Sequence, residues 1–307
     1  MNTRTTSPTI QLTENGPILS RIVAGMMNLI SWKISTAELI EFINACLDLG
    51  ITTFDHADIY GDYTCEEVFG KALGAESGLR NRMQLVTKCG IKSISPRWPG
   101  NGVKHYDLTR EHITASVETS LKNLQTEMID LLLIHRYDPL MDVDEITEVF
   151  FQLKKSGKVR YFGVSNFSPH QVDLLNSRLE DPLVTNQIRF SVLYPEVMFD
   201  GTLDQCQMNR TPLMAWSPLG GGEIFTGNST RVQQLRSVLN EVAAKYENTS
   251  LDGVAIAWLL SHPAKVMPVL GSGKIGRLES AVDAALLEIS RQDWFKILEA
   301  STGHEVL

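Results

Sequence analysis

The sequence predicts a (β/α)8 barrel, also called a TIM barrel, with an N-terminal β-hairpin and an extra C-terminal helix. Three observations lead to this fold class. Eight short apolar runs alternate with amphipathic stretches along the chain, as repeated βα units require. Polar or otherwise unusual residues stand at the ends of these runs, where barrel enzymes carry their chemistry. The 307 residues contain no low-complexity linker, so we expect a single domain spanning 1–307.

The eight runs are short and nearly all apolar, a pattern typical of parallel strands covered on both faces. In chain order they occupy residues 21–25, 51–55, 83–88, 129–135, 159–165, 183–188, 212–217 and 266–271. A hairpin is predicted before them, because residues 9–12 and 17–19 flank Asn15 and Gly16, a dipeptide that favours tight turns. We expect this hairpin to cap the bottom of the barrel.

Helical periodicity fills the segments between the strands. Leu39, Ile43 and Leu47 repeat at a spacing of four and share one helix face. A capping box that starts at Ser35 marks where this helix begins. A last apolar pattern, around Trp294, follows the eighth βα unit. This pattern predicts the extra C-terminal helix.

Composition and charge exclude several classes of function. A hydrophobic content of 43% with 21% charged residues is typical of a globular protein. The net charge of −8, with no block of Lys and Arg, argues against a nucleic-acid surface. No apolar run approaches the roughly 20 residues that span a bilayer, so we expect no membrane partner. Scattered cysteines and a polar N-terminus indicate a cytoplasmic protein, either a monomer or a weak homo-oligomer.

Four residues at or just after strand ends form a proton-delivery set for a carbonyl group. Tyrosine titrates at about pH 10, too high for efficient proton donation at neutral pH. An ammonium group near Tyr60 lowers that pKa; Lys88 supplies it, and the carboxylate of Asp55 holds Lys88 charged and in place. A neutral His135 orients a carbonyl through its N–H group. Each residue alone has an ordinary role in turns or packing, and their joint occurrence indicates catalysis.

The stretch 269–277 contains three glycines in the G-x-G-x-x-G spacing of a dinucleotide-binding turn. Such a turn needs a βαβ unit with an acidic residue about 20 positions further on, whereas the chain beyond Gly276 is helical. The Walker A pattern also fails, because Arg277 stands where Lys is required. A phosphate site in the last βα loop of a barrel remains. Its cations would be Lys274 and Arg277, with Ser272 as a donor.

Six stretches of the chain resemble the aldo-keto reductase family and occur in the family's order. They are GITTFDHADIYG (50–61), LVTKCG (85–90), DLLLIHRYDP (130–139), GKVRYFGVSNF (157–167), TNQI (185–188) and MAWSPLGGG (214–222). The resemblance extends over essentially the whole chain. It implies NADPH-dependent reduction of aldehyde or ketone carbonyls to alcohols by hydride transfer on a (β/α)8 barrel. The partner is then a small-molecule carbonyl substrate.

The resemblance also implies roles for the residues at the barrel mouth. Tyr60 would be the general acid, Lys88 and Asp55 would tune it, and His135 would orient the substrate carbonyl. We expect Trp32 to join His135 in contacting the substrate. We expect no bound metal.

The cofactor residues that the resemblance implies lie after the first strand and after the fifth to eighth strands. They are Gly25, Met26, Ser165, Asn166, Gln187, Trp216, Ser217, Pro218, Leu219, Gly220, Gly271, Ser272, Gly273, Lys274 and Arg277. Ser165, Asn166 and Gln187 would bond the nicotinamide carboxamide, and Trp216 would stack on the nicotinamide ring. Residues 217–220 would follow the pyrophosphate. Residues 272–277 would bind the adenosine 2′-phosphate, which favours NADPH over NADH.

Three positions depart from the family pattern. His56 follows Asp55 where a small hydroxyl residue is frequent, Arg189 stands near Gln187 where an acid is frequent, and Ala281 replaces an Asn that reads adenine. The last departure leaves the adenine contacts of this chain open.

Three other functions stay open at the level of the sequence. Lys88 could form a Schiff base, as in an aldolase, although a neighbouring Asp55 opposes the lowered lysine pKa that this requires. A metal could bind His56, His135, Asp55 and Asp58, although no H-x-H or H-E-x-x-H spacing occurs. The chain could also be an NADPH-binding regulatory subunit with little turnover.

Overall fold

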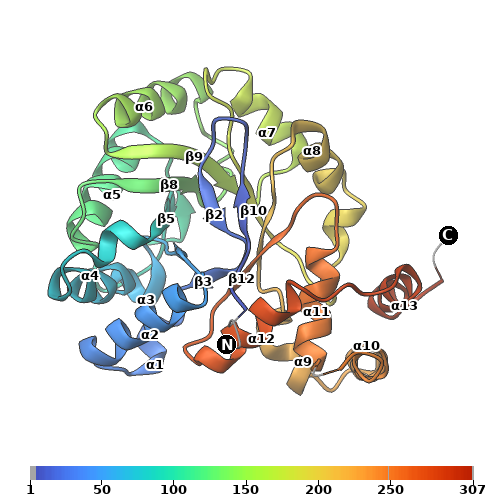
Figure 1. Ribbon diagram of the computed structural model, residues 1–307. Helices are drawn as coiled ribbons and strands as arrows, with labels where there is room; N and C mark the ends of the chain where they lie inside the picture. The colour runs from blue at the N-terminus through green and yellow to red at the C-terminus, as the bar shows by residue number, and fades with distance from the viewer. Residues whose placement is uncertain (1–4, 248, 306–307) are drawn as a thin grey trace.

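The computed structural model describes residues 5–247 and 249–305. Over these residues, eight parallel strands close into a barrel in the order β10-β11-β12-β3-β4-β5-β8-β9. Helices surround the barrel (Figure 1). The predicted (β/α)8 barrel is therefore confirmed, and with it the expectation that the carboxyl ends of all the strands meet at one mouth.

The barrel strands coincide with the eight apolar runs. They are β3 (Val23–Gly25), β4 (Thr53–Asp55), β5 (Gln84–Cys89), β8 (Ile129–Ile134), β9 (Val159–Ser165), β10 (Asn186–Arg189), β11 (Met214–Trp216) and β12 (Met267–Leu270). Most runs are trimmed by one to three residues at an end, whereas β5 and β10 each extend one residue beyond the prediction. The runs are uniformly apolar because barrel strands are covered on both faces; β8, for example, is buried along its whole length.

The helices cover the outside of the barrel and its loops. They are α1 (Leu29–Trp32), α2 (Thr36–Asp48), α3 (Tyr60–Tyr63), α4 (Cys65–Ala75), α5 (Arg110–Asn123), α6 (Val143–Lys155), α7 (Pro169–Asn176), α8 (Thr202–Asn209), α9 (Glu223–Thr226), α10 (Thr230–Ala243), α11 (Leu251–Leu260), α12 (Ile275–Ala284) and α13 (Arg291–Thr302). Short 3-10 turns are η1 (Leu79–Arg82), η2 (Glu196–Met198) and η3 (Gly220–Gly222). The capping box of α2 is confirmed, because Ser35 and Glu38 bond each other's backbone N–H groups.

A hairpin closes the bottom of the barrel, as predicted. β1 (Thr9–Gln11) pairs antiparallel with β2 (Ile18–Ser20), and in Figure 1 the hairpin lies across the barrel. Leu12 and Leu19 are fully buried and pack with barrel-interior side chains such as Val86 and Leu131. The barrel interior is thus filled by side chains at this end, and ligands must approach the opposite end.

A second hairpin in the loop after β5 was not predicted. There β6 (Ile91–Lys92) pairs antiparallel with β7 (His105–Tyr106), and the loop between them folds over Tyr63. The Tyr63 hydroxyl accepts the Ser93 N–H at 3.0 Å, and the Trp98 ring lies edge-on to the Tyr63 ring at 6.0 Å. The hairpin strands have only two residues each, too few for any periodicity to be read from the sequence.

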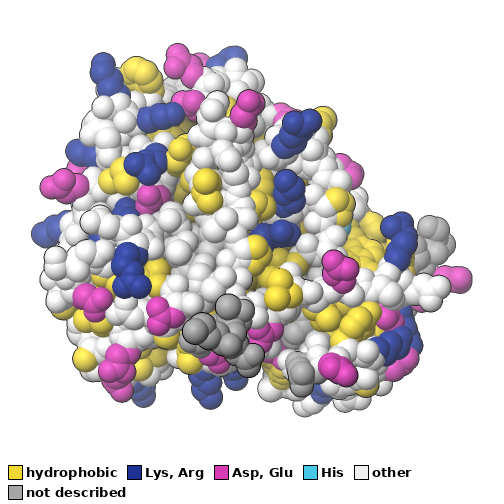
Figure 2. Space-filling view, in the orientation of Figure 1, with side chains coloured by type: hydrophobic (Ala, Val, Ile, Leu, Met, Phe, Trp, Pro, Cys, Tyr) yellow, Lys and Arg dark blue, Asp and Glu magenta, His cyan; other side chains and the backbone are white. Residues whose placement is uncertain are grey.

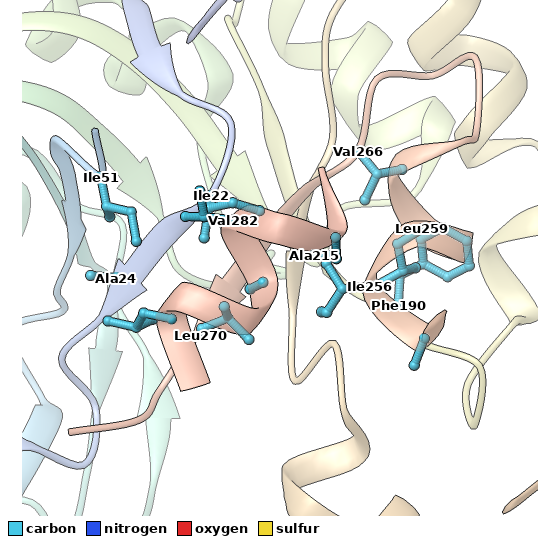
Figure 3. Close-up of a cluster of buried hydrophobic side chains, with 14 of the residues drawn as sticks. Ile22, Ala24, Ile51, Phe190, Ala215, Ile256, Leu259, Val266, Leu270 and Val282 are labelled. Carbon is cyan, nitrogen blue, oxygen red and sulfur yellow. The ribbon is translucent and has the colours of Figure 1, made fainter. Parts of the chain in front are cut away.

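The largest apolar cluster lies between the barrel and its outer helices. Figure 3 shows Ile256 and Leu259 of α11 and Val282 of α12 against strand residues such as Ala215 and Leu270. The extra helix α13 is attached to this layer by a reciprocal contact. Trp258 and Trp294 stack at 5.1 Å, and each indole N–H donates to the other residue's carbonyl, at 3.1 and 3.0 Å.

The surface shown in Figure 2 carries Lys and Arg side chains interspersed with Asp and Glu. This mixture agrees with the absence of any basic block in the sequence. In the part of the chain that the structure describes, no helix combines the length and apolarity needed to cross a membrane.

Candidate active site

The four predicted catalytic residues meet at the mouth of the barrel. Lys88 is fully buried, and its Nζ donates to both carboxylate oxygens of Asp55 at 2.7 Å. The same Nζ donates to the His56 carbonyl at 2.8 Å and lies 3.2 Å from the Tyr60 hydroxyl. The Tyr60 and His135 rings face each other edge-on at 6.0 Å. One ammonium group therefore connects a carboxylate to a phenol beside an imidazole.

Strand register explains how these side chains meet. Asp55, the last residue of β4, lies opposite Val86 of β5. Lys88 stands two residues further along β5 and so points to the same, inner face. Tyr60 then reaches the pair from the first position of α3.

The pKa of Lys88 is raised in this environment. Burial alone would lower it, but the charges of Asp55 and Tyr60 and their hydrogen bonds outweigh burial. Lys88 is therefore a permanent cation. A protonated, fully buried amine with its donors occupied is a poor nucleophile, and the structure gives no support to a Schiff base at this residue.

The expectation that Lys88 brings the Tyr60 pKa below its ordinary value is not met. Burial raises the Tyr60 pKa, Lys88 lowers it, and Asp55 raises it again, with a net upward shift. The sequence could not reveal this balance, because the extent of burial depends on the fold. The phenol consequently stays protonated at neutral pH, and the contribution of Lys88 is to reduce the cost of forming the phenolate.

His135 is neutral at physiological pH. Burial lowers its pKa well below the ordinary value, and the charges of Lys88, Arg136 and Lys104 add to the effect. Its Nδ1 is buried without a hydrogen-bond partner among the described residues. Because Nδ1 is buried, a ligand could bond this ring only at Nε2.

A chain of hydrogen bonds connects the catalytic set to the predicted nicotinamide residues. Gln187 Nε2 donates to Asp55 Oδ1 at 2.8 Å, and the Ser165 hydroxyl donates to the Gln187 carbonyl at 2.7 Å. Asn166 Nδ2 donates to the Ser165 hydroxyl at 2.7 Å, and the Trp216 indole N–H donates to Asn166 Oδ1 at 3.0 Å. The four residues thus form one rigid wall next to Asp55.

Two of these strand ends carry strained backbone. Asn166 and Ser217 have φ values of 59° and 52°, in the left-handed region that non-glycine residues rarely adopt. The stretch continues through Gly220, with φ of 61°. A Cβ at Gly220 would lie 2.4 Å from Leu193, so the loop packs directly on the segment that follows β10. Strain of this kind is retained where a site needs a particular backbone shape.

The loop after β12 has the features of an anion site. Lys274 and Arg277 are exposed, and no described carboxylate lies within 4.0 Å of either charge. Helix α12 begins here without a side-chain cap, so its first turn has N–H groups without a capping partner, although the Arg277 N–H donates to the Lys274 carbonyl at 3.0 Å. Ser272 Oγ accepts the Lys274 N–H at 3.2 Å and thereby shapes the loop.

Trp32 lies against this loop. A Cβ at Gly273 would come within 2.6 Å of the indole, and Asn28 Nδ2 donates to the Gly271 carbonyl at 3.3 Å. The other neighbour of Trp32 is Phe42 of α2, with ring centroids 5.2 Å apart. The structure therefore places Trp32 beside the predicted phosphate loop, and this position suits a cofactor-side role better than the expected contact with substrate.

The two predicted cofactor residues at the end of β3, Gly25 and Met26, differ in the groups that they could offer to a ligand. Gly25 is buried, and a Cβ there would lie 3.1 Å from a methyl group of Val269, so a larger residue would require Val269 to shift. The Met26 side chain is fully buried in the core. Its N–H donates to the Asp55 carbonyl, and its own carbonyl accepts the Leu29 N–H. Both polar groups of Met26 are thus already paired.

Two buried acids, Asp58 and Glu66, lie near Lys88; the sequence interpretation considered Asp58 only as a metal ligand and did not single out Glu66. Asp58 accepts the Ser116 hydroxyl at 2.6 Å, and Glu66 accepts the Thr87 hydroxyl at 2.6 Å. Burial raises the pKa of Asp58 to about 7, with a further contribution from Glu66.

Among the described residues, no group of three or more His, Cys, Asp or Glu comes together as a metal site. His56 packs edge-on against Phe69 at 4.5 Å.

The barrel and the Asp55, Tyr60, Lys88 and His135 set define the class of protein. Residues 21–301 match the aldo/keto reductase family model, and the chain belongs to this family of oxidoreductase enzymes, which use nicotinamide cofactors.

Named relatives agree with this assignment. The chain is 50% identical to the uncharacterized oxidoreductase YcsN of Bacillus subtilis, over 97% of this chain and 99% of that protein. It is 45% identical to a 6-dehydroglucose reductase of Agrobacterium fabrum, over 94% of this chain and 96% of that protein. Its fold resembles the crystal structure of a thermostable aldo-keto reductase, Tm1743, with a TM-score of 0.80, 25% identity and coverage of 95% and 99%.

Proposed function

We propose that this chain reduces aldehyde or ketone carbonyls to alcohols with NADPH, with Tyr60 as the general acid. The observation that carries the proposal is the position of the Lys88 ammonium, 2.7 Å from both oxygens of Asp55 and 3.2 Å from the Tyr60 hydroxyl. A phenol next to a buried cation can lose its proton at lower cost than one in apolar surroundings.

The residues divide the work of the reaction. When bound, a reduced nicotinamide would supply the hydride for the carbonyl carbon. The Tyr60 hydroxyl donates its proton to the carbonyl oxygen, and Lys88 stabilises the phenolate that remains until it is reprotonated from solvent. Neutral His135 donates a hydrogen bond to the same oxygen and holds the carbonyl toward Tyr60. Asp55 and Gln187 keep Lys88 in position.

Two independent features support the cofactor. The wall of Gln187, Ser165, Asn166 and Trp216 presents amide, hydroxyl and indole groups beside Asp55. These groups suit the planar nicotinamide ring and its carboxamide. The loop after β12 combines Lys274, Arg277 and a helix N-terminus, a combination that binds phosphate. We assign NADPH rather than NADH on the strength of this second feature.

Substitution of Tyr60 by Phe tests the proposal. The variant should lose about 100-fold or more of its carbonyl reduction rate, while the dissociation constant of NADPH, measured by calorimetry, stays within about twofold. Tyr63→Phe is the matched control. It removes a hydroxyl from the same helix that bonds Ser93, and it should retain the wild-type rate.

A wild-type rate in Tyr60→Phe would refute the acid assignment. NADPH binding by the wild type without any turnover, over a panel of aldehydes, ketones and α-dicarbonyls, would instead favour a regulatory subunit. Because two relatives, at 45% and 35% identity, are named 6-dehydroglucose reductases, we propose the aldehyde of an oxidised hexose as the first substrate in that panel.

A further inference from the structure

Arg189, the last residue of β10, offers a free positive charge at the mouth of the barrel. Its strand register pairs it with Trp216 of β11. Gln187, two residues earlier, bonds Asp55 inside the barrel, so Arg189 lies on the same inner face, one layer nearer to solvent. Arg189 is exposed. None of the residues described by the structure places a carboxylate within 4.0 Å of its guanidinium.

Aromatic rings hold this guanidinium in place. Its Cζ lies 4.0 Å from the centre of the Tyr194 ring and 5.9 Å from that of Trp216. Tyr194 returns toward β10 through a tight turn, in which its N–H donates to the Ser191 carbonyl at 3.0 Å. The Tyr194 hydroxyl donates to Glu223 at 2.9 Å. The guanidinium thus lies over the Tyr194 ring, and no hydrogen bond from its N–H donors to another described residue is found, so these donors are available to a ligand.

The contacts of Arg189 lead directly to the loop that would follow the pyrophosphate. Trp216 begins that loop and Glu223, the partner of Tyr194, ends it. Between them, Gly220 packs on Leu193 of the same turn that carries Tyr194. Arg189 therefore lies alongside residues 217–222, on the nicotinamide side, whereas Lys274 and Arg277 belong to the separate loop after β12.

We propose that Arg189 binds the pyrophosphate of the dinucleotide, at the phosphate nearer to the nicotinamide. The inference rests on the proposed function. A bound pyrophosphate would bring two negative charges to the mouth of a protein whose net charge is −8, and the loop 217–222 has no lysine or arginine of its own. A planar guanidinium that is preorganised by stacking binds phosphate oxygens at a smaller entropic cost than a mobile lysine.

Fragments of the cofactor distinguish this role from that of Arg277. Dissociation constants are measured by calorimetry for NADPH, NADH, reduced nicotinamide mononucleotide and adenosine 2′,5′-bisphosphate. Arg189→Gln should weaken the first three by about tenfold, the usual size of one charge-assisted hydrogen bond, and leave the bisphosphate unchanged. Arg277→Gln, the matched control, should weaken NADPH and the bisphosphate and leave NADH and the mononucleotide unchanged.

A second variant at Arg189 tests whether the loss of affinity comes from the side chain itself rather than from an indirect change in the protein. Arg189→Lys keeps the charge but loses the planar stack, and it should recover part of the lost affinity. Because Arg189 is exposed, thermal midpoints of all variants should match that of the wild type.

The proposal is overturned if Arg189→Gln binds all four ligands as the wild type does, or loses affinity only for the bisphosphate. Unchanged cofactor affinity with a raised KM for acidic carbonyl substrates would overturn it as well, and would assign Arg189 to substrate. Failure of the proposed function gives different results: the wild type would bind none of the four ligands if the cofactor assignment is wrong, and it would bind them without turnover if the chain is a regulatory subunit.

Discussion

Asp58 makes the stability of this protein depend on pH in a way that one substitution should reveal. Its carboxyl group is buried, with Oδ2 bonded to Ser116 at 2.6 Å and Oδ1 without a partner among the described residues. Burial raises its pKa from 3.8 to about 7. Asp58→Asn removes the titrating group and keeps the size of the side chain.

The sign of this pH dependence follows from the upward shift of the Asp58 pKa. A carboxyl group whose folded-state pKa is raised contributes stability that is fully present below the unfolded-state value and is lost as pH rises through the folded-state value. The window for Asp58 therefore runs from about pH 4 to about pH 7. A shift of about three units, at roughly 1.4 kcal/mol each, corresponds to at most about 4 kcal/mol.

Urea unfolding of wild type and Asp58→Asn between pH 4 and pH 8 measures this difference. The variant should be similar to the wild type, or slightly less stable, at pH 4, and more stable by about 2–4 kcal/mol at pH 8. The exposed Asp62, in α3 shortly after Asp58, provides a control, since Asp62→Asn should follow the wild-type curve. Parallel curves for wild type and Asp58→Asn would refute the reasoning, because Asp58 would then be charged throughout.

Two further predictions concern the mouth of the barrel. Lys88→Met should lower the free energy of unfolding by about 3–5 kcal/mol, because it leaves the buried Asp55 carboxylate without its cation. Urea unfolding at pH 7 measures this loss. A loss below about 1 kcal/mol would contradict a buried ion pair. Gly273→Ala should weaken NADPH by about tenfold, because the new Cβ would lie 2.6 Å from Trp32. Gly276→Ala is the control in the same calorimetric measurement, since the nearest atom to its new Cβ would be 3.8 Å away, at Glu279. Equal losses of NADPH affinity in the two variants would contradict the argument from the Trp32 contact.

The fold and the positions of the chemical groups were predictable because parallel strands carry regular signals. Each apolar run ended close to its predicted boundary, and the side chains at the ends necessarily meet at one mouth. Asp55 and Lys88 were therefore predictable as neighbours. Their separation was not, since it depends on the register that sets Asp55 opposite Val86.

Other features depend on tertiary structure alone. Tyr194 reaches Arg189 through an irregular turn with no periodic pattern, and neither residue has a local signature. The direction of the Tyr60 pKa also escaped prediction, because it is a balance between burial and two charges of opposite sign. Sequence supplies the charges, but burial is known only once the chain is folded. For the same reason the packing of Trp32 on Gly273 was not predictable, and its expected contact with substrate stays a prediction.

The stacked Trp258 and Trp294 pair gives the protein two separate optical signals. Trp32, Trp98 and Trp216 lie in or beside loops at the barrel mouth, while the pair joins α11 to α13. Two nearly parallel indoles 5.1 Å apart should couple as an exciton through their strong far-ultraviolet transitions, which circular dichroism detects. That signal would disappear when α13 detaches, and emission from the mouth would be quenched when a ligand enters. One sample would then report local unfolding of the C-terminal helix and occupancy of the site independently.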